Sequence, residues 1–388
     1  MNITITPGKL NGTVAAIPSK SMAHRLLICA AFANRETVLY CPDTNRDIEA
    51  TANCLNALGA AVLRTPTGYT VTPVRQIPKE ANLYCAESGS TLRFLLPIAG
   101  ALGVTATFHM EGRLPQRPLS PLWEEMERMG CCLSRPTENT VLCTGKLRPG
   151  NYTIDGGVSS QYITGLLFAH ALLGEESTLT VTGKVESRPY IDMTRQVLAQ
   201  FRAPDFHSPG TITVEGDWSN AAFWLSARTL GSDLTVTNLN ANSAQGDRAI
   251  EALLSIREEN PTIDASDIPD LVPVLSVARA CFRGVTFTGI RRLRLKESDR
   301  VESTISMLEA LGGKAQATED TLTVYPTGLT GGTVNPMNDH RIAMAAAIAS
   351  TVCREPVTIL GAECVEKSYP KFWEEFSRLG GKYELNLR

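Results

Sequence analysis

The sequence predicts an α/β protein of two domains, each built from three similar α/β units. Two observations point to this fold class. The chain has 388 residues, more than one ordinary hydrophobic core accommodates, and 43% of them are hydrophobic, enough to fill two cores. A helical stretch that ends in a large apolar residue, often with Gly next, also recurs roughly every 55 to 70 residues, as expected of a structural repeat.

Six helix ends carry this repeat. Gly after the last helical residue suits the left-handed backbone that closes many helices, and two β-like runs joined by a polar turn follow the clearest examples. The stretches after Gln200 and from Leu254 to Ile268 are short, so two units are expected to be trimmed. The six ends lie at Leu55 to Gly59, Met126 to Gly130, Val197 to Phe201, Ile250 to Leu254, Met307 to Gly313 and Phe376 to Gly381.

The domain boundary is expected near the strand-like Thr211–Val214 and Gly216. The opening residues Met1–Ile5 alternate like a strand and are assigned to the second half of the chain. This division predicts one domain from residues 1–12 and 214–388 and another from residues 13–213, with the site in the cleft between them. Hinged closure of that cleft over a ligand is a further hypothesis.

Composition argues against several classes of function. Lys plus Arg number 37 against 40 for Asp plus Glu, a net charge of −3, so no basic excess is available for binding nucleic acid or a membrane surface. None of the ten Cys is spaced as C-x-x-C and the five His form no H-E-x-x-H pair, so no metal site or redox dithiol is indicated. Without a membrane-length apolar run or a recognisable signal peptide, a soluble, cytoplasmic protein is expected.

A polar cluster, Lys296–Arg300, stands between the β-like Gly284–Thr288 and the helix-like Val301–Leu311. Ser298 or Asp299 can cap this helix, and the free N–H groups of a first helical turn suit an anionic ligand. Taken alone, the five residues are better explained by a solvated, well-capped helix start with Lys296 and Arg300 paired at i,i+4.

Four further helix entrances are rich in polar or cationic side chains, and three of them also contain hydroxyl groups or Gly. They are Ser19–Arg25, Ser88–Arg93, Gly156–Gln161 and Asn338–Arg341, each just before an apolar helical run. Capping alone explains any one of them, but together they would concentrate partial positive charge at one end of several helices. The set therefore predicts a cleft for polyanions.

Other loops add charged groups. Arg113–Pro118 is a stiffened loop with two guanidinium groups, suited to forked contacts with phosphate or carboxylate. Ser187–Tyr190 offers a hydroxyl, a cation and a phenol, although an ordinary turn is an equally good interpretation. Asp270 enters an apolar stretch, where a carboxylate must be capped, paired or functional. Lys367 would by itself be interpreted as a surface lysine.

Nine motifs in chain order resemble the enolpyruvyl transferase family, and within it the members that act on shikimate 3-phosphate. The resemblance spans the chain and implies a two-domain inside-out α/β barrel of six βαβαββ-type repeats, three per domain, with helix amino-termini facing the cleft. The motifs are Ser19–Arg25, Glu87–Arg93, Gln116–Pro118, Ser159–Gln161, Ser187–Asp192, Ile268–Asp270, Lys296–Arg300, Asn338–Arg341 and Lys367.

The resemblance implies an activity as well as a fold. The enolpyruvyl (1-carboxyvinyl) group of phosphoenolpyruvate would pass to the 5-hydroxyl of shikimate 3-phosphate through a tetrahedral intermediate, with release of phosphate, in the shikimate pathway to aromatic amino acids. The implied partners are these small molecules only. Neither a metal nor an organic cofactor is implied, and the protein would be a monomer.

The matching positions imply two sets of binding residues. Shikimate 3-phosphate would be held by Lys20, Ser21, Arg25, Ser159, Ser160, Gln161, Ser187, Tyr190, Asp270 and Lys296. Phosphoenolpyruvate would be held by Lys20, Gly89, Arg117, Gln161, Arg300, Arg341 and Lys367.

The implied chemistry needs an acid and a base, because a hydroxyl loses a proton while C3 of the enol gains one. Asp270 is the candidate base, Glu297 the candidate for proton delivery to C3, and Lys20 a third catalytic candidate. The assignment is a hypothesis, since both carboxylates and Lys20 can be given proton roles.

Two positions depart from the family pattern, and three alternatives remain. Glu87 stands where many members have Asn, and Ser90 where many have Thr.

A related transferase acts on UDP-N-acetylglucosamine and carries a reactive Cys in a mobile loop, whereas Glu111–Pro118 contains none. RNA 3′-phosphate cyclase shares related units but needs a nucleic-acid surface, and a non-catalytic protein that binds phosphorylated metabolites would not need both Asp270 and Glu297.

Overall fold

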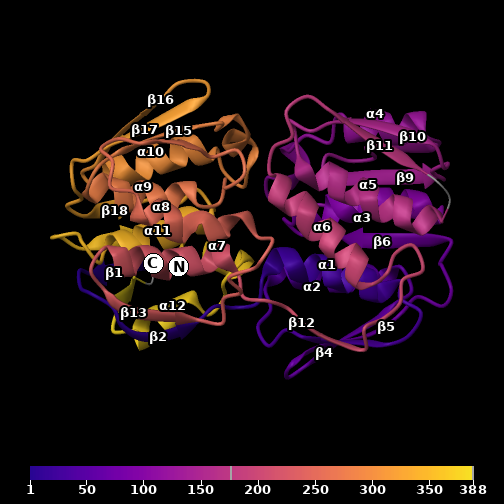
Figure 1. Ribbon diagram of the computed structural model, residues 1–388, viewed down its shortest axis with the longest axis horizontal. Helices are drawn as coiled ribbons and strands as arrows, with labels where there is room; N and C mark the ends of the chain where they lie inside the picture. The colour runs from indigo at the N-terminus through magenta and orange to yellow at the C-terminus, as the bar shows by residue number, and fades with distance from the viewer. Residues whose placement is uncertain (175–176, 387–388) are drawn as a thin grey trace. The chain divides into compact units, whose positions relative to one another are not determined.

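The computed structural model describes residues 1–174 and 177–386 and shows a mixed α/β protein (Figure 1). The predicted fold class is thereby confirmed at this level. The chain divides into two compact units, the first formed by Met1–Ile17 with Gly216–Arg388 and the second by Pro18–Glu215. The predicted domain bounds, 1–12 with 214–388 and 13–213, stay a prediction. Strand β2 (Asn11–Ala15) pairs along its whole length with β13 (Asp233–Thr237).

The second unit alternates helices with short strands. Its helices are α1 (Lys20–Ala31), α2 (Arg46–Ala57), α3 (Gly89–Leu102), η1 (Leu114–Gln116), α4 (Leu122–Arg128), α5 (Ser160–Leu173) and α6 (Arg188–Gln200). Its strands are β3 (Thr37–Tyr40), β4 (Ala61–Thr65), β5 (Gly68–Thr72), β6 (Glu80–Tyr84), β7 (Thr105–His109), β8 (Cys131–Ser134), β9 (Thr140–Gly145), β10 (Asn151–Asp155), β11 (Thr178–Thr182) and β12 (Thr211–Thr213).

The first unit combines the opening strands with the second half of the chain. Its helices are α7 (Trp218–Thr229), η2 (Gly246–Ala249), α8 (Ile250–Ser255), α9 (Val272–Cys281), η3 (Arg291–Leu295), α10 (Arg300–Ala310), α11 (His340–Ala349), η4 (Ala362–Lys367) and α12 (Phe372–Arg378). Besides β2 and β13, its strands are β1 (Asn2–Thr6), β14 (Thr262–Asp264), β15 (Val285–Thr288), β16 (Lys314–Ala317), β17 (Thr321–Tyr325), β18 (Gly332–Val334), β19 (Val357–Ile359) and β20 (Lys382–Asn386).

Six small sheets are present in the described part of the chain. Four of them have four strands in the orders β12-β3-β5-β4, β6-β7-β9-β8, β14-β15-β17-β16 and β18-β19-β1-β20, and in each the first pair is parallel and the other two are antiparallel. The pairs β10-β11 and β13-β2 are two-stranded and parallel. The chain runs from α6 to β12, and from α8 to β14, without an intervening hairpin. The βαβαββ repeat and the inside-out barrel stay predictions.

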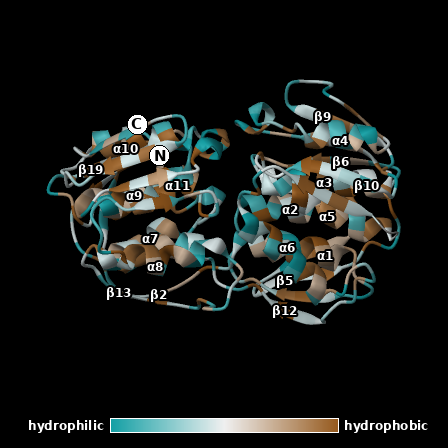
Figure 2. Ribbon diagram, turned by 45° about the horizontal axis from the view of Figure 1, so that its top comes forward, coloured by the Kyte–Doolittle hydropathy of each residue, from teal (hydrophilic) through white to brown (hydrophobic). Residues whose placement is uncertain are grey.

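The most apolar helices form the interior of each unit. In the second unit α5 lies beside α3 and α6, and α1 lies beside α2 and α6 (Figure 1). In the first unit α11 lies beside α7 and α9. Figure 2 shows hydrophobic residues along α3 and α11, almost all of whose residues are buried, whereas α2 and α6 also carry hydrophilic residues on an exposed face. Gly165 permits the close packing of α5 on α3, because a Cβ there would lie 2.3 Å from the carbonyl oxygen of Arg93.

Buried helices have polar amino-terminal turns, because their first N–H groups have no partner within the helix. Side chains at the N-cap positions satisfy them: Ser19 accepts from Met22 N, Ser88 from Thr91 N, and Asp217 from Asn220 N. The polar entrances predicted from the sequence are therefore the capped starts of the interior helices. No helix in the described residues has the length and apolar character needed to cross a membrane.

Candidate active site

The first unit gathers two arginines and three carboxylates, here named the arginine–carboxylate cluster: Asp270, Glu297, Arg300, Asp339 and Arg341. Arg300 is 1% exposed and donates to all three acids. Its Nη1 lies 2.7 Å from Asp270 Oδ1, its Nη2 lies 2.8 Å from Glu297 Oε2, and its Nε lies 3.0 Å from Asp339 Oδ2. Burial would lower the pKa of Arg300, but these carboxylates outweigh it and raise the pKa above its usual value, so the guanidinium stays charged.

Helix capping places the two guanidinium groups side by side in this cluster. Arg300 is the first residue of α10, whose N-cap Asp299 accepts from Val301 N and Glu302 N. Arg341 is the second residue of α11, whose N-cap Asp339 accepts from Arg341 N at 2.9 Å. Because Asp339 also accepts from Arg300, one fully buried carboxylate fixes the starts of both helices.

Arg341 retains unused hydrogen-bond donors. Its Nη2 donates to Ser219 Oγ at 2.8 Å and to Asp270 Oδ2 at 3.3 Å. Its Nε and Nη1 are buried and have no hydrogen-bond partner among the described residues. Since a buried guanidinium is costly without partners, these two atoms indicate a position for an anionic ligand.

Opposing charges perturb the acids and the lysine beside this cluster. Burial alone would raise the pKa of Asp270, but the charges of Arg341, Lys296 and Arg300 hold it well below its usual range. Burial lowers the pKa of Lys296 to about 8, although its Nζ lies 4.0 Å from Asp270 Oδ1. Asp247, on η2, has its pKa raised to about 8 by burial and then by the charge of Asp270.

Lys367 is a buried lysine and not a surface one. It is 6% exposed, at the end of η4, and its Nζ donates to the carbonyl oxygen of Asn338 at 2.9 Å. Asn338 immediately precedes the N-cap of α11. The ammonium group therefore lies beside the same helix start as Arg341.

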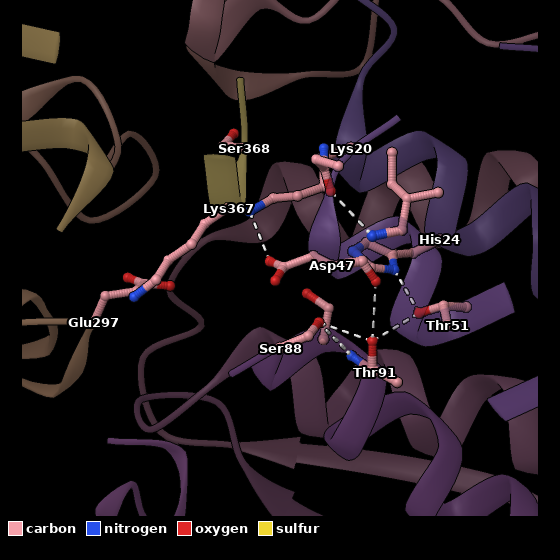
Figure 3. Close-up of polar contacts among 12 residues, drawn as sticks. Lys20, His24, Asp47, Thr51, Ser88, Thr91, Glu297, Lys367 and Ser368 are labelled. Carbon is pink, nitrogen blue, oxygen red and sulfur yellow. Dashed lines mark hydrogen bonds and ion pairs between the residues drawn. The ribbon is translucent and has the colours of Figure 1, made fainter. Parts of the chain in front are cut away.

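In the second unit, Lys20 opens α1 and pairs with Asp47 at 3.0 Å. Asp47 belongs to the first turn of α2. Thr91 links this turn to α3 by contacting the carbonyl oxygen of Asp47 at 3.5 Å and Ser88 Oγ at 2.8 Å (Figure 3). Thr51 continues the chain of hydrogen bonds from Thr91 at 2.7 Å. These contacts hold the starts of α1, α2 and α3 together.

Arg25 is buried among neutral oxygens. Nε donates to Thr194 Oγ1 at 2.9 Å, Nη1 to the carbonyl oxygen of Ser21 at 2.6 Å, and Nη2 to the carbonyl oxygen of Tyr190 at 2.9 Å. The guanidinium also lies over the Phe94 ring, 5.0 Å from its centre. Burial lowers the pKa of Arg25 to about 10, so the group is charged at neutral pH. No acidic partner balances this charge among the described residues, which again suits an anionic ligand.

Arginines also surround the start of α3. Arg93 donates to Gln161 Oε1 at 2.7 Å and to the carbonyl oxygen of Pro118 at 3.0 Å, and Gln161 Nε2 lies 3.0 Å from Ser90 Oγ. A Cβ added to Gly89 would lie 2.7 Å from Arg117 Nη1. The backbone of Gly89 therefore approaches this guanidinium more closely than a residue with a side chain could.

Three serines lie at the starts of α5 and α6. Ser159 caps α5 by accepting from Gln161 N, and both Ser159 and Ser160 are buried. Ser187 precedes α6 in the left-handed backbone region, with φ of 55°, and is 1% exposed. Tyr190 is the third residue of the same helix. All four predicted contacts thus sit within the first turns of two neighbouring helices.

Comparison with known proteins identifies the family. The sequence model described as EPSP synthase (3-phosphoshikimate 1-carboxyvinyltransferase) matches residues 5–376. The chain belongs to the EPSP synthase family. Among curated relatives of this name, one from Clostridium kluyveri is 38% identical over 417 residues and one from Clostridium perfringens (strain 13) is 39% identical, each match covering 98% of both chains. The resemblance to enolpyruvyl transferases is confirmed.

Solved structures of EPSP synthase and a related enzyme share the fold. EPSP synthase from Acinetobacter baumannii, in a 2.37 Å structure, is similar with a TM-score of 0.78 and 23% identity, covering 99% of this chain and 100% of that one. The enolpyruvyl transferase NikO from Streptomyces tendae is similar with a TM-score of 0.73 and 17% identity, covering 99% and 98% of the two chains.

The structure groups the predicted EPSP synthase residues within each unit. Asp270, Lys296, Glu297, Arg300 and Arg341 are brought together in the first unit. In the second, Arg25 contacts the backbone of Ser21 and Tyr190, while Gly89 approaches Arg117. Several residues that contact the predicted site residues were not themselves predicted: Asp47, Arg93, Thr164, Thr194, Ser219 and Asp339. Two of them, Arg93 and Asp339, lie inside the sequence motifs. The position of Asp339 before an apolar helix was a usable signal; nothing local indicated Thr194.

Proposed function

We propose that this chain transfers the enolpyruvyl group of phosphoenolpyruvate to the 5-hydroxyl of shikimate 3-phosphate and releases phosphate. The observation that carries the proposal is the state of two buried guanidinium groups. Arg25 has only neutral partners, and Arg341 keeps two donor atoms without partners, among the described residues. Two incompletely compensated arginines in a member of this family match its two anionic substrates.

The proposed roles follow the two clusters. Shikimate 3-phosphate would be bound by residues of both units. They are Ser21, Arg25, Ser159, Ser160, Gln161, Ser187 and Tyr190 of the second unit and Asp270 and Lys296 of the first. Phosphoenolpyruvate would be bound by Arg300, Arg341 and Lys367 of the first unit and by Lys20, Gly89, Arg117 and Gln161 of the second. Lys20, like Gln161, is assigned to both substrates.

The reaction proceeds by addition and then elimination. In the addition, the 5-oxygen of shikimate 3-phosphate bonds to C2 of phosphoenolpyruvate and Asp270 receives the hydroxyl proton. Glu297, which must be protonated in the substrate complex, gives its proton to C3 and becomes a carboxylate. In the elimination, C3 returns a proton to Glu297, the double bond re-forms, and the C2–O bond to phosphate breaks. Lys20, Arg117 and Lys367 neutralise the charge that develops on the leaving phosphate.

Substrate binding can turn Asp270 from a weak base into a stronger one by raising its low pKa. Without substrate, its carboxylate is held by Arg300 and Arg341 at 2.7 and 3.3 Å, which depresses its pKa. A substrate carboxylate bound to these arginines competes with Asp270 for their hydrogen bonds and positive charge. The pKa of Asp270 then rises towards that of an ordinary carboxyl, and it accepts the hydroxyl proton more readily.

The finer features expected of the family belong to the same proposal. They are the inside-out α/β barrel of six βαβαββ-type repeats, the domains 1–12 with 214–388 and 13–213, an active site in the cleft between them, a cytoplasmic location and a monomeric state. The strand pairing common to the four larger sheets supports the repeat.

Phosphate release by the purified protein tests the proposed function. With phosphoenolpyruvate present, adding shikimate 3-phosphate is expected to release phosphate, whereas adding UDP-N-acetylglucosamine is not. Release only with the nucleotide sugar would assign the chain to the sister activity. Tight binding of both substrates without any release would indicate a non-catalytic binding protein.

A further inference from the structure

Two buried threonines hold Arg25 in place. Thr164 on α5 and Thr194 on α6 are both 0% exposed, and their hydroxyl oxygens lie 2.9 Å apart. Arg25 Nε donates to Thr194 Oγ1 at 2.9 Å, and Arg25 Nη2 reaches Thr164 Oγ1 at 3.5 Å. The carbonyl oxygen of Tyr190 lies 3.0 Å from Thr194 Oγ1 and 2.9 Å from Arg25 Nη2.

Counting protons fixes the direction of every bond in this group. The Tyr190 carbonyl can only accept, so Thr194 donates its single hydroxyl proton to it. Thr194 must then accept from Arg25 Nε and from the hydroxyl of Thr164. Thr164, having donated its proton, accepts from Arg25 Nη2. The result is a closed ring in which each hydrogen bond has a single possible donor and acceptor. A buried polar network that is fully satisfied in this way is rigid.

The ring joins three helix starts that carry proposed contacts to shikimate 3-phosphate. Arg25 comes from α1, Thr164 follows the Ser159–Gln161 turn on α5, and Thr194 lies one turn after Tyr190 on α6. A carboxylate in place of the threonines would neutralise Arg25, as the acids do for Arg300. Hydroxyl groups orient the guanidinium without neutralising its charge, which leaves that charge for a ligand.

We propose that Thr194, supported by Thr164, is a positioning residue that aims Arg25 and the start of α6 at shikimate 3-phosphate. This inference rests on the proposed function, in which Arg25 binds that substrate. It assigns the two threonines no contact with the reacting atoms. Their effect therefore belongs to the affinity for one substrate and not to the chemical step.

Thr194→Val is the decisive variant, because Val keeps the shape of Thr and removes the hydroxyl. Arg25 Nε then loses its acceptor in a buried position. Since a hydrogen bond to a charged group is involved, we expect the KM for shikimate 3-phosphate to rise about tenfold or more, with kcat and the KM for phosphoenolpyruvate within about threefold. Thr194→Ser keeps the hydroxyl and should restore the KM. Thr164→Val should have a smaller effect, because Arg25 Nη2 keeps the Tyr190 carbonyl.

Thr351→Val is the matched control. Thr351 is 4% exposed and its hydroxyl donates to the carbonyl oxygen of Ile348 at 2.8 Å, just beyond the carboxyl end of α11. This variant makes the same change in a buried position away from the predicted contacts, so it should lower the melting temperature without changing either KM.

The outcomes separate the inference from the proposed function. If wild-type protein releases no phosphate from the two substrates, the proposed function fails. If the wild type is active but Thr194→Val has an unchanged KM for shikimate 3-phosphate, only the positioning role fails. Equal rises in both KM values, or a rise that Thr194→Ser reproduces, would show a general packing defect and would also overturn the inference.

Discussion

Replacing Gly89 by Ala should weaken phosphoenolpyruvate binding through Arg117. Gly89 is the first residue of α3, so the helical backbone accepts Ala there. The added Cβ, however, would lie 2.7 Å from Arg117 Nη1, 3.1 Å from Arg117 Cζ and 3.0 Å from Arg93 Nη1. Contacts this short force the guanidinium of Arg117 to move, and Arg93 has little room because Gln161 and the Pro118 carbonyl hold it.

The expected magnitude follows from what Arg117 would lose. A displaced guanidinium gives up one charge-assisted hydrogen bond to the substrate, which contributes about 1.5–3 kcal/mol. That energy corresponds to a rise of roughly 10- to 150-fold in the KM for phosphoenolpyruvate. Because the contacts at Arg25 are untouched, the KM for shikimate 3-phosphate should change by less than about threefold.

Steady-state kinetics of Gly89→Ala and Gly100→Ala provide the test. Gly100 lies in the same helix, but an added Cβ there would meet Cys131 Sγ at 2.8 Å and Leu147 Cγ at 3.0 Å, in the hydrophobic core. Gly100→Ala should therefore lower the melting temperature and leave both KM values unchanged. A wild-type KM for phosphoenolpyruvate in Gly89→Ala, or an equal change of that KM in both variants, would contradict a role of the Gly89–Arg117 contact in binding.

Three further substitutions test the charged groups. Glu297→Gln cannot supply a proton to C3, so kcat should fall by about 10²- to 10⁴-fold with both KM values little changed, and near-normal turnover would remove Glu297 from the mechanism. Lys296 loses its charge as the pH rises through its lowered pKa of about 8, so the KM for shikimate 3-phosphate should rise above that pH. Lys296→Arg should shift this rise to higher pH, because Arg stays charged, and an identical pH profile would contradict the assignment. Burial raises the pKa of Asp247 from 3.8 to about 8 in the folded state. Between about pH 4 and pH 8, Asp247 is therefore ionised in the unfolded chain but protonated in the folded one. The free energy of unfolding should fall as the pH rises through this range. Asp247→Asn should reduce the fall in melting temperature over that range, and an unchanged fall would contradict a raised pKa.

Local patterns in the sequence were enough to locate the helix starts. A polar residue followed by an apolar run marks an N-cap by chemistry that acts over a few residues, and α1, α3, α5 and α11 begin where such patterns occur. At Lys296–Arg300 two caps were possible, and Asp299 is the one that caps α10. Ser298 instead contacts Asp339 and Ser303.

Partners distant in the chain could not be predicted in this way. Arg25 and Thr194 are 169 residues apart, and Arg300 and Asp339 are 39 apart. Their contacts depend on how the helices pack, which capping patterns and periodicity do not specify. Lys367 shows the same limit, because a lysine in a polar stretch is normally exposed, and only the tertiary structure places it beside the carbonyl of Asn338.

In the proposed reaction the chain adds the 5-hydroxyl of shikimate 3-phosphate to phosphoenolpyruvate and then eliminates phosphate. NMR of the product formed in D2O tests both steps at once. We expect an enolpyruvyl ether on the 5-oxygen, with deuterium in its methylene group, because C3 gains an exchangeable proton from Glu297 and then loses one of its three hydrogens. An ether without deuterium would contradict addition followed by elimination, and the absence of any ether would contradict the proposed function.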